Sequence, residues 1–264
     1  MALALENWPR PHYRSGGGDA FLFYVVYGPA PLSFSISRSK YRFDGVPEGI
    51  DMISYGPASS PEAVGSFRSG YVWEELQRSD AELAADLAKQ PECLLIRGTV
   101  ADPQELNYLR NVIGLVSWLL DSNGIAVYDP QMLKWWTPSE WKTVVLNPGS
   151  ALPRHHVVIL VSEDENGTEW FHTRGMRKFG RPDLSTHQVP AERRTGVADL
   201  FNRFIEYQAF GGIIDEGEEV RMHSLPSGMR CTHRGHVDDP DFNNVHVEIM
   251  WPVDGEPARA ETAP

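Results

Sequence analysis

A run of apolar residues at helical spacing, set between two strand-like segments, constrains the fold of this chain most. Segments 92–99 and 125–128 are short and apolar, as strands are, and the run between them recurs at intervals of three and four. A strand, a helix and a second strand in this order predict a βαβ unit, which joins parallel strands by a right-handed crossover. The helical run consists of Leu106, Leu109, Ile113, Val116 and Leu120.

The ends of this helix also carry local signals. Asp102, followed by Pro103 and Glu105, has the order of an N-cap residue, a first-turn proline and a third-position carboxylate. Asn123 and Gly124 are typical of a helix C-terminus. We therefore expect the helix to begin directly after Asp102.

Two more helices and several strands are expected. Ser79 and Glu82 form a capping-box pattern before one helix, and another runs from about residue 191 to Gly211. Asn166-Gly167 predicts a hairpin, and residues 44–70 are expected to form a long surface loop. The remaining strand-like segments are 20–27, 32–36, 155–162, 169–172, 185–189, 218–224, 229–233 and 245–251.

Strands that follow one another directly indicate an α+β protein rather than a Rossmann fold. We expect a mixed, largely antiparallel sheet with the βαβ unit, in two closely packed α/β halves. The predicted division is a flexible N-terminal segment at 1–18, an N-terminal half at 19–147, a C-terminal half at 148–252, and a disordered tail at 253–264.

The formal charge of the 264-residue chain is −12, which disfavours binding to nucleic acid or to an anionic membrane surface. The first 18 residues lack the apolar core of a signal peptide, and no apolar run is long enough to span a membrane. The chain is therefore expected to be cytoplasmic. Cys93 and Cys231, the two cysteines, are predicted to be free thiols.

Standard catalytic and nucleotide-binding motifs do not occur in the sequence. The P-loop, the dinucleotide-binding glycine pattern, the zinc-protease motif and the nucleophile-elbow motif are all missing. No cofactor is expected on this basis. A protein partner is the first expectation, and a small anionic ligand is the second.

The most distinctive segment is basic and rich in turns. Residues 174–194 contain six basic and two acidic residues, although the chain as a whole is acidic. We interpret four side chains as a candidate binding site for an anion or carboxylate, because arginine is suited to bidentate contact with such groups. These candidates are His172, Arg174, Arg177 and Arg181.

The same segment has a purely structural interpretation. Gly175 and Gly180 would form tight turns, Met176 and Phe179 would fill the core, and the arginines would pair with acidic neighbours. The sequence leaves both interpretations open.

The string HTRGMRKFGRPDL at 172–184 resembles a signature of uncharacterised bacterial domain families, which carry a Gly-Leu/Met…Phe-Gly-Pro-Glu/Asp-Leu core of similar form. The region 94–141 is similar in style, so the resemblance covers about half of the chain. It implies membership of such a family and assigns no catalytic role.

A second group of residues has the chemistry of a metal site. Cys231, His233, His236 and Asp238 include every ligand type that zinc or iron accepts. Cys231 and His233 would share one face of a strand, whereas His236 follows a turn at Gly235. The alternative is a hairpin with a solvated acidic loop.

Two other features also have a functional and a structural interpretation. Trp135, Trp136 and Trp141 could form a ligand platform, although such clusters usually belong to a core. Asp129 ends a predicted parallel strand, where α/β proteins often place functional groups.

Two functions of different classes follow. The first is a non-catalytic binding or interaction protein, such as an immunity-like or accessory factor. The second is an enzyme or small-molecule binder that uses the basic site around residues 172–181.

Overall fold

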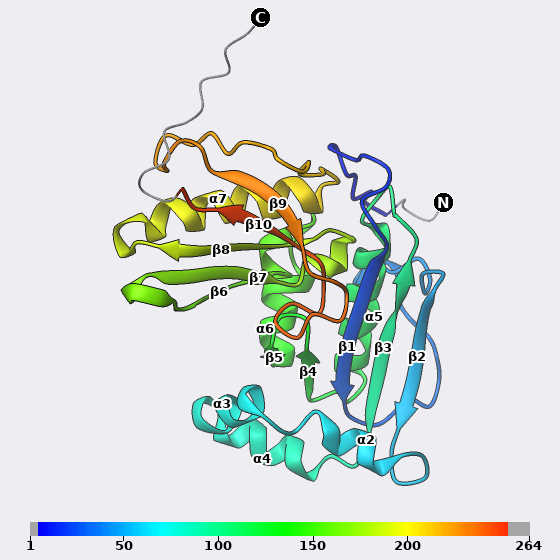
Figure 1. The fold of residues 1–264 in the computed structure, drawn as a ribbon. Coiled ribbons are helices and arrows are strands. Elements are labelled where there is room, and N and C mark those ends of the chain that lie inside the picture. Colours follow the sequence, from blue (N-terminus) through cyan, green and yellow to red (C-terminus); the bar gives the residue numbers. More distant parts are fainter. Residues whose placement is uncertain (1–4, 253–264) are drawn as a thin grey trace, which may run out of the picture.

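The computed structural model describes residues 5–252, and its strands form two five-stranded sheets (Figure 1). The first sheet has the order β2-β3-β1-β4-β5, and neighbouring strands are antiparallel throughout. Its strands are β1 (Ala20–Tyr27), β2 (Ile50–Tyr55), β3 (Cys93–Val100), β4 (Ala126–Asp129) and β5 (Lys134–Trp136).

The predicted βαβ unit is present in this sheet, and a further strand, β1, lies between its two parallel strands. β3 and β4 are both antiparallel to β1, so they run parallel to each other with β1 between them. The connecting helix α5 (Asn107–Asp121) begins five residues after Asp102. The predicted N-cap role of Asp102 is therefore wrong: its carboxylate accepts hydrogen bonds from the N-terminal segment instead.

The second sheet has the order β6-β7-β8-β10-β9. β8 and β10 are parallel, and the other neighbours are antiparallel, so the α+β prediction with mostly antiparallel strands is confirmed. Asn166 and Gly167 form the predicted hairpin between β6 and β7. The strands are β6 (Val158–Glu163), β7 (Glu169–Arg174), β8 (Asp183–Val189), β9 (Arg230–Arg234) and β10 (His246–Met250).

Three local predictions are wrong. Segments 32–36 and 218–224 are not strands, and the predicted loop at 44–70 contains β2 and a short helix. Segment 32–36 alternates serine with apolar residues, but no neighbouring strand pairs with it, and Leu32 and Phe34 remain exposed. An alternating pattern fits a sheet surface and cannot by itself supply a partner strand.

Helices cover both faces of the first sheet and one face of the second (Figure 1). α5 packs on one side of the first sheet, α2 to α4 pack on the other, and α7 packs on the second sheet. None of the helices within residues 5–252 has the length and apolar character needed to cross a membrane. Besides α5, the α-helices are α1 (Arg38–Tyr41), α2 (Pro61–Ser66), α3 (Tyr71–Ser79), α4 (Ala81–Lys89), α6 (Pro138–Glu140) and α7 (Arg194–Ala209).

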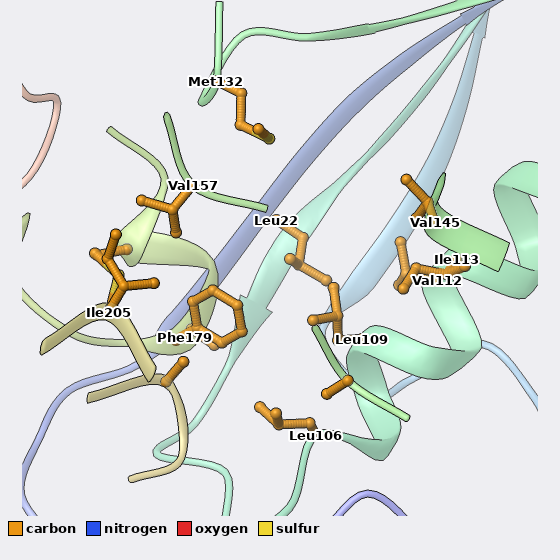
Figure 2. Packing of buried hydrophobic residues seen from close by; sticks show 14 of the residues in the cluster. Leu22, Leu106, Leu109, Val112, Ile113, Met132, Val145, Val157, Phe179 and Ile205 are labelled. Atoms are coloured by element: carbon orange, nitrogen blue, oxygen red, sulfur yellow. The ribbon is translucent and has the colours of Figure 1, made fainter. Parts of the chain in front are cut away.

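One apolar core extends across both sheets, and Phe179 lies at its centre. The side chain comes from the turn before β8 and lies between Ile205 of α7 and Leu109 of α5 (Figure 2). Trp136 and Trp141 belong to the same core, and Trp135 is buried against α3. The core interpretation of the tryptophan cluster is therefore confirmed.

A buried ion pair joins the first sheet to that turn. Lys178 Nζ lies 2.6 Å from Asp129 Oδ2 at the end of β4, and the lysine side chain is 0% exposed. Lys178 also donates to the carbonyl oxygen of His156, and Asp129 Oδ1 accepts from the backbone amides of Gln131 and Met132. Burial raises the pKa of Asp129 and lowers that of Lys178, while their mutual attraction opposes both shifts.

This pair makes a testable contribution to stability. Lys178→Met leaves a buried carboxylate without its counter-ion, so we expect the free energy of unfolding to fall by about 3–5 kcal/mol in urea titrations. The double variant Lys178→Met/Asp129→Asn should recover part of the loss, because both charges are removed. Arg203→Met, which breaks an exposed ion pair with Asp199 on α7, should cost under about 1 kcal/mol. Equal losses in the single and double variants would contradict the account.

Candidate anion-binding site

The basic segment folds as a strand, a compact turn and a second strand. β7 ends at Arg174, a 3-10 turn spans Met176–Phe179, and β8 begins at Asp183. Gly175 and Gly180 flank the turn with φ angles of 118° and 62°, in the left-handed region that favours glycine. A Cβ atom on Gly180 would lie 2.2 Å from the carbonyl oxygen of Gly18, so the N-terminal chain passes directly over the turn.

The turn is largely structural, as one interpretation of the sequence predicts. Met176, Lys178 and Phe179 are buried, and all three contribute to the junction between the sheets. The basic side chains of residues 174–181 therefore form two groups: Lys178 and Arg181 lie inside the junction, and Arg174 and Arg177 line the cavity of about 250 Å³ between the sheets.

Arg181 belongs to the structural group. Its guanidinium is 2% exposed and donates to the carbonyl oxygens of Gly211 and Gly212 beyond the end of α7, at 2.9 and 3.0 Å. It also donates to Gly180. A Cβ atom on Gly17 would lie 1.8 Å from Arg181 Nη1, so only glycine leaves room for this side chain. Arg181 also lines a smaller cavity of about 170 Å³, but protein carbonyl oxygens already accept hydrogen bonds from its guanidinium, so a ligand role for Arg181 stays a prediction.

Arg10 holds the same region from the opposite side. It is buried and donates to the carbonyl oxygens of Ala209, Pro103 and Phe179. Cations placed at the free carbonyl groups near a helix C-terminus are favourable. Residues 5–18, within the segment predicted to be flexible, thus include side chains that pack into the fold, and the predicted tail at 253–264 lies outside the described residues.

Arg174 and Arg177 meet at a cavity of about 250 Å³ between the two sheets. Arg174 is 8% exposed and donates from Nη1 to the carbonyl oxygen of Asp241 at 2.7 Å. In the part of the chain that the structure describes, its Nε has no hydrogen-bond partner. Arg177 donates to the carbonyl oxygen of Asn243 and lies 4.5 Å from the centre of the Phe21 ring. A buried guanidinium has five N–H donors, so Arg174 is incompletely satisfied in the protein alone.

Aromatic side chains form much of the remaining wall. Phe21 and Phe23 come from β1, and Phe242 comes from the loop between β9 and β10. Gln131 fixes the β1 side, because its amide donates to the carbonyl oxygen of Phe21 and accepts from the backbone amide of Phe23. The lining of the cavity therefore combines cationic groups with apolar rings.

Asp183 is a buried carboxyl group at this cavity. It accepts hydrogen bonds from Thr173 Oγ1, the Met176 backbone amide and Asn244 Nδ2, at 2.8, 3.2 and 2.9 Å. Burial raises its pKa to about 6, while these hydrogen bonds and the nearby Arg174 oppose the rise. When Asp183 is ionised, the two arginines retain one net positive charge, which suits a singly charged anion.

His172 lies on the same strand face as Arg174, two residues away, but it does not line the cavity. Its ring stacks 4.0 Å from that of Trp170 and contacts Phe242. Burial, with a smaller effect of Arg174, lowers its pKa to about 4, so the imidazole is neutral near pH 7. His172 supports Phe242 in the wall and brings no charge to the cavity.

The predicted metal ligands are not brought together. Cys231 is a buried free thiol in β9, as is Cys93 in β3, in agreement with the prediction for the cysteines. A ring nitrogen of His233 lies 2.8 Å from the carbonyl oxygen of Ile214, and His236 Nδ1 accepts from the backbone amide of Asp238. Among residues 5–252, no three histidine, cysteine, aspartate or glutamate side chains are placed to hold one metal ion.

Comparisons of this chain with protein-family models, with curated protein sequences and with solved structures find no match. The resemblance of residues 172–184 to bacterial domain families therefore stays a prediction. We therefore infer a function from the geometry of the cavity.

The sequence predicts Arg174 and Arg177 as site residues, but it does not predict the other residues that line the cavity. Phe21 and Phe23 alternate with Leu22 and Tyr24 along β1, which indicates two different faces. This alternation indicates that both faces of β1 are covered, because a strand with aromatic residues on both faces must bury each face against other parts of the protein. Phe242 carries no comparable signal in the sequence.

We expect the ionisation of Asp183 to make the free energy of unfolding depend on pH. Its folded-state pKa of about 6 lies above the ordinary value of 3.8, so it favours the folded state at low pH, and that contribution is lost as pH rises through about 6. Relative to Asp183→Asn, the parent's free energy of unfolding should fall by roughly 1–3 kcal/mol between pH 4 and pH 7. Urea titrations at both pH values measure this difference. Asp199→Asn, an exposed change on α7, is the matched control, and an equal pH effect there would contradict the assignment.

Proposed function

We propose that this chain is a binding protein for a small organic carboxylate with an apolar body, held in the cavity between the two sheets. The observation that supports this proposal most is the state of Arg174. Its guanidinium is buried, lines the cavity and makes one hydrogen bond within residues 5–252. Charged groups that are removed from water require partners, and an anionic ligand would supply the missing one.

The shape and lining of the cavity favour a small ligand. Its volume of about 250 Å³ is slightly below the range of roughly 300–1,000 Å³ that is typical of drug-sized ligands. Phe21, Phe23 and Phe242 would enclose an apolar body, while Arg174 and Arg177 would pair with the carboxylate.

This proposal combines both functions inferred from the sequence: binding without an assigned reaction, and a small anion at the basic segment. A protein partner and a cytoplasmic location stay predictions from the acidic composition and the apolar pattern of the sequence.

Benzoate is a suitable first ligand, with benzamide as its neutral analogue of the same shape. We expect isothermal titration calorimetry to detect benzoate binding, and benzamide to bind at least about tenfold more weakly, because only the carboxylate pairs with Arg174. Arg174→Met should weaken benzoate binding by roughly 10- to 100-fold, since charge-assisted hydrogen bonds contribute about 1.5–3 kcal/mol.

Two further variants make the result interpretable. Arg177→Gln, at a half-buried position, should also weaken benzoate binding without unfolding the protein, and Arg203→Met should leave it unchanged. Equal binding of benzoate and benzamide would contradict the proposal, and so would undiminished binding in folded Arg174→Met. If none of a panel of aliphatic and aromatic monocarboxylates binds the parent protein, the proposal fails.

A further inference from the structure

A second and larger cavity lies away from the basic segment. Its volume is about 490 Å³, nearly twice that of the cavity at Arg174, and none of its lining residues is shared with that cavity. It is bordered by α1, the C-terminal part of α5 and the π-helix Trp141–Leu146. The volume falls within the range that is typical of small-molecule sites.

Cationic side chains from three places in the chain line this cavity. Lys40 comes from α1, Arg42 follows α1 directly, and Lys142 comes from the π-helix. This is unexpected in a chain with 36 acidic and 24 basic residues. Two carboxylates, Glu6 and Asp121, also line the cavity, so one positive charge remains.

The remaining charge is localised at Lys142. Lys40 Nζ lies 2.6 Å from Asp121, and Arg42 Nη1 lies 3.7 Å from Glu6. Among the described residues, Lys142 has neither an ion pair nor a side-chain hydrogen bond, and it is exposed. The cavity thus presents one unpaired ammonium group beside two charge pairs whose carboxylate oxygens can accept further hydrogen bonds.

The backbone around this cavity is unusual at two points. Arg42 has a φ of 51°, in the left-handed region that non-glycine residues seldom adopt, and its guanidinium donates to the carbonyl oxygen of Pro148. In the π-helix, the amide of Asn147 donates to the carbonyl oxygen of Lys142 at 2.9 Å. Rare backbone conformations cost free energy and persist only where the surrounding structure stabilises them. Such conformations and π-turns are frequent at functional sites.

Hydrogen bonds and ring contacts hold the floor of the cavity in place. Trp141 is buried, and its Nε1 donates to Ser117 Oγ at 2.9 Å, while Ser117 donates to the carbonyl oxygen of Ile113. Trp141 also packs against Trp136 and Tyr24. This positions the start of the π-helix, and with it Lys142, relative to α5.

We propose that this cavity binds a phosphorylated polyol, such as a sugar phosphate. The phosphate would pair with Lys142 and with Lys40 and Arg42, because lysine and arginine from separate elements can surround a compact anion. The hydroxyl groups would donate to Glu6 and Asp121, which a carboxylate ligand with an apolar body could not do. Ser39 at the rim offers a further polar contact. This assignment does not depend on the function proposed for the Arg174 cavity.

Glucose 6-phosphate, glucose and inorganic phosphate test the assignment by isothermal titration calorimetry. We expect glucose 6-phosphate to bind, inorganic phosphate to bind more weakly, and glucose to show no measurable binding. Lys142→Gln should weaken glucose 6-phosphate binding by about tenfold, and Lys142→Glu should weaken it further, because loss of a charge-assisted contact has this size. Both changes are at an exposed position, so the variants should fold.

Lys89→Gln, an equal loss of charge at an exposed position on α4, is the matched control and should leave binding unchanged. Arg174→Met should also leave it unchanged, which separates this site from the first. The proposal is overturned if glucose 6-phosphate does not bind, or if it binds equally to the parent and to both Lys142 variants. Equal affinities for inorganic phosphate and glucose 6-phosphate would overturn the polyol assignment.

Discussion

Buried cations at the junction of the two sheets hold the turn at Met176–Phe179 in place, and the Arg174 cavity depends on that turn. Lys178 joins it to Asp129 of β4, and Arg181 joins the following residues to the carbonyl groups beyond α7. With the turn fixed, β7 ends so that Arg174 and Arg177 lie opposite Phe21 of β1. Loss of this ion pair and these hydrogen bonds would separate the walls of the cavity, because the walls belong to different sheets.

The cavities use charge in different ways. At the Arg174 cavity, burial removes water from a guanidinium, so that an anion gains much from pairing with it. At the cavity beside the π-helix, the cations lie mostly at the surface and their field is screened, so several are needed for one phosphate. The two proposed ligand classes follow from this contrast: an apolar monocarboxylate for the Arg174 cavity and a hydrophilic phosphate for the cavity beside the π-helix.

Much of the fold follows from the sequence, and the failures have physical causes. The alternation in β1 and the helical spacing of Leu109 and Ile113 identified elements that bury apolar faces. The local pattern around Asp102 predicts a helix N-terminus. That pattern cannot reveal that Gly16 and Tyr13, nearly ninety residues away, donate hydrogen bonds to the Asp102 carboxylate. The basic segment stands out in the sequence, but composition could not separate Arg174 and Arg177 from Arg181. That separation depends on which side of the turn each side chain occupies, and only the tertiary structure determines this.

The most direct test of this separation is the free energy of unfolding of three variants, Arg174→Met, Arg177→Met and Arg181→Met, measured without ligand. Arg181→Met leaves several buried carbonyl groups without donors and should cost about 3 kcal/mol or more. At pH 5, below the Asp183 pKa of about 6, Arg177→Met and Arg174→Met each lose one hydrogen bond to the protein and should cost at most about 1 kcal/mol. A loss at Arg174 as large as that at Arg181 would show that Arg174 is also structural, and would contradict the central claim that it is reserved for a ligand.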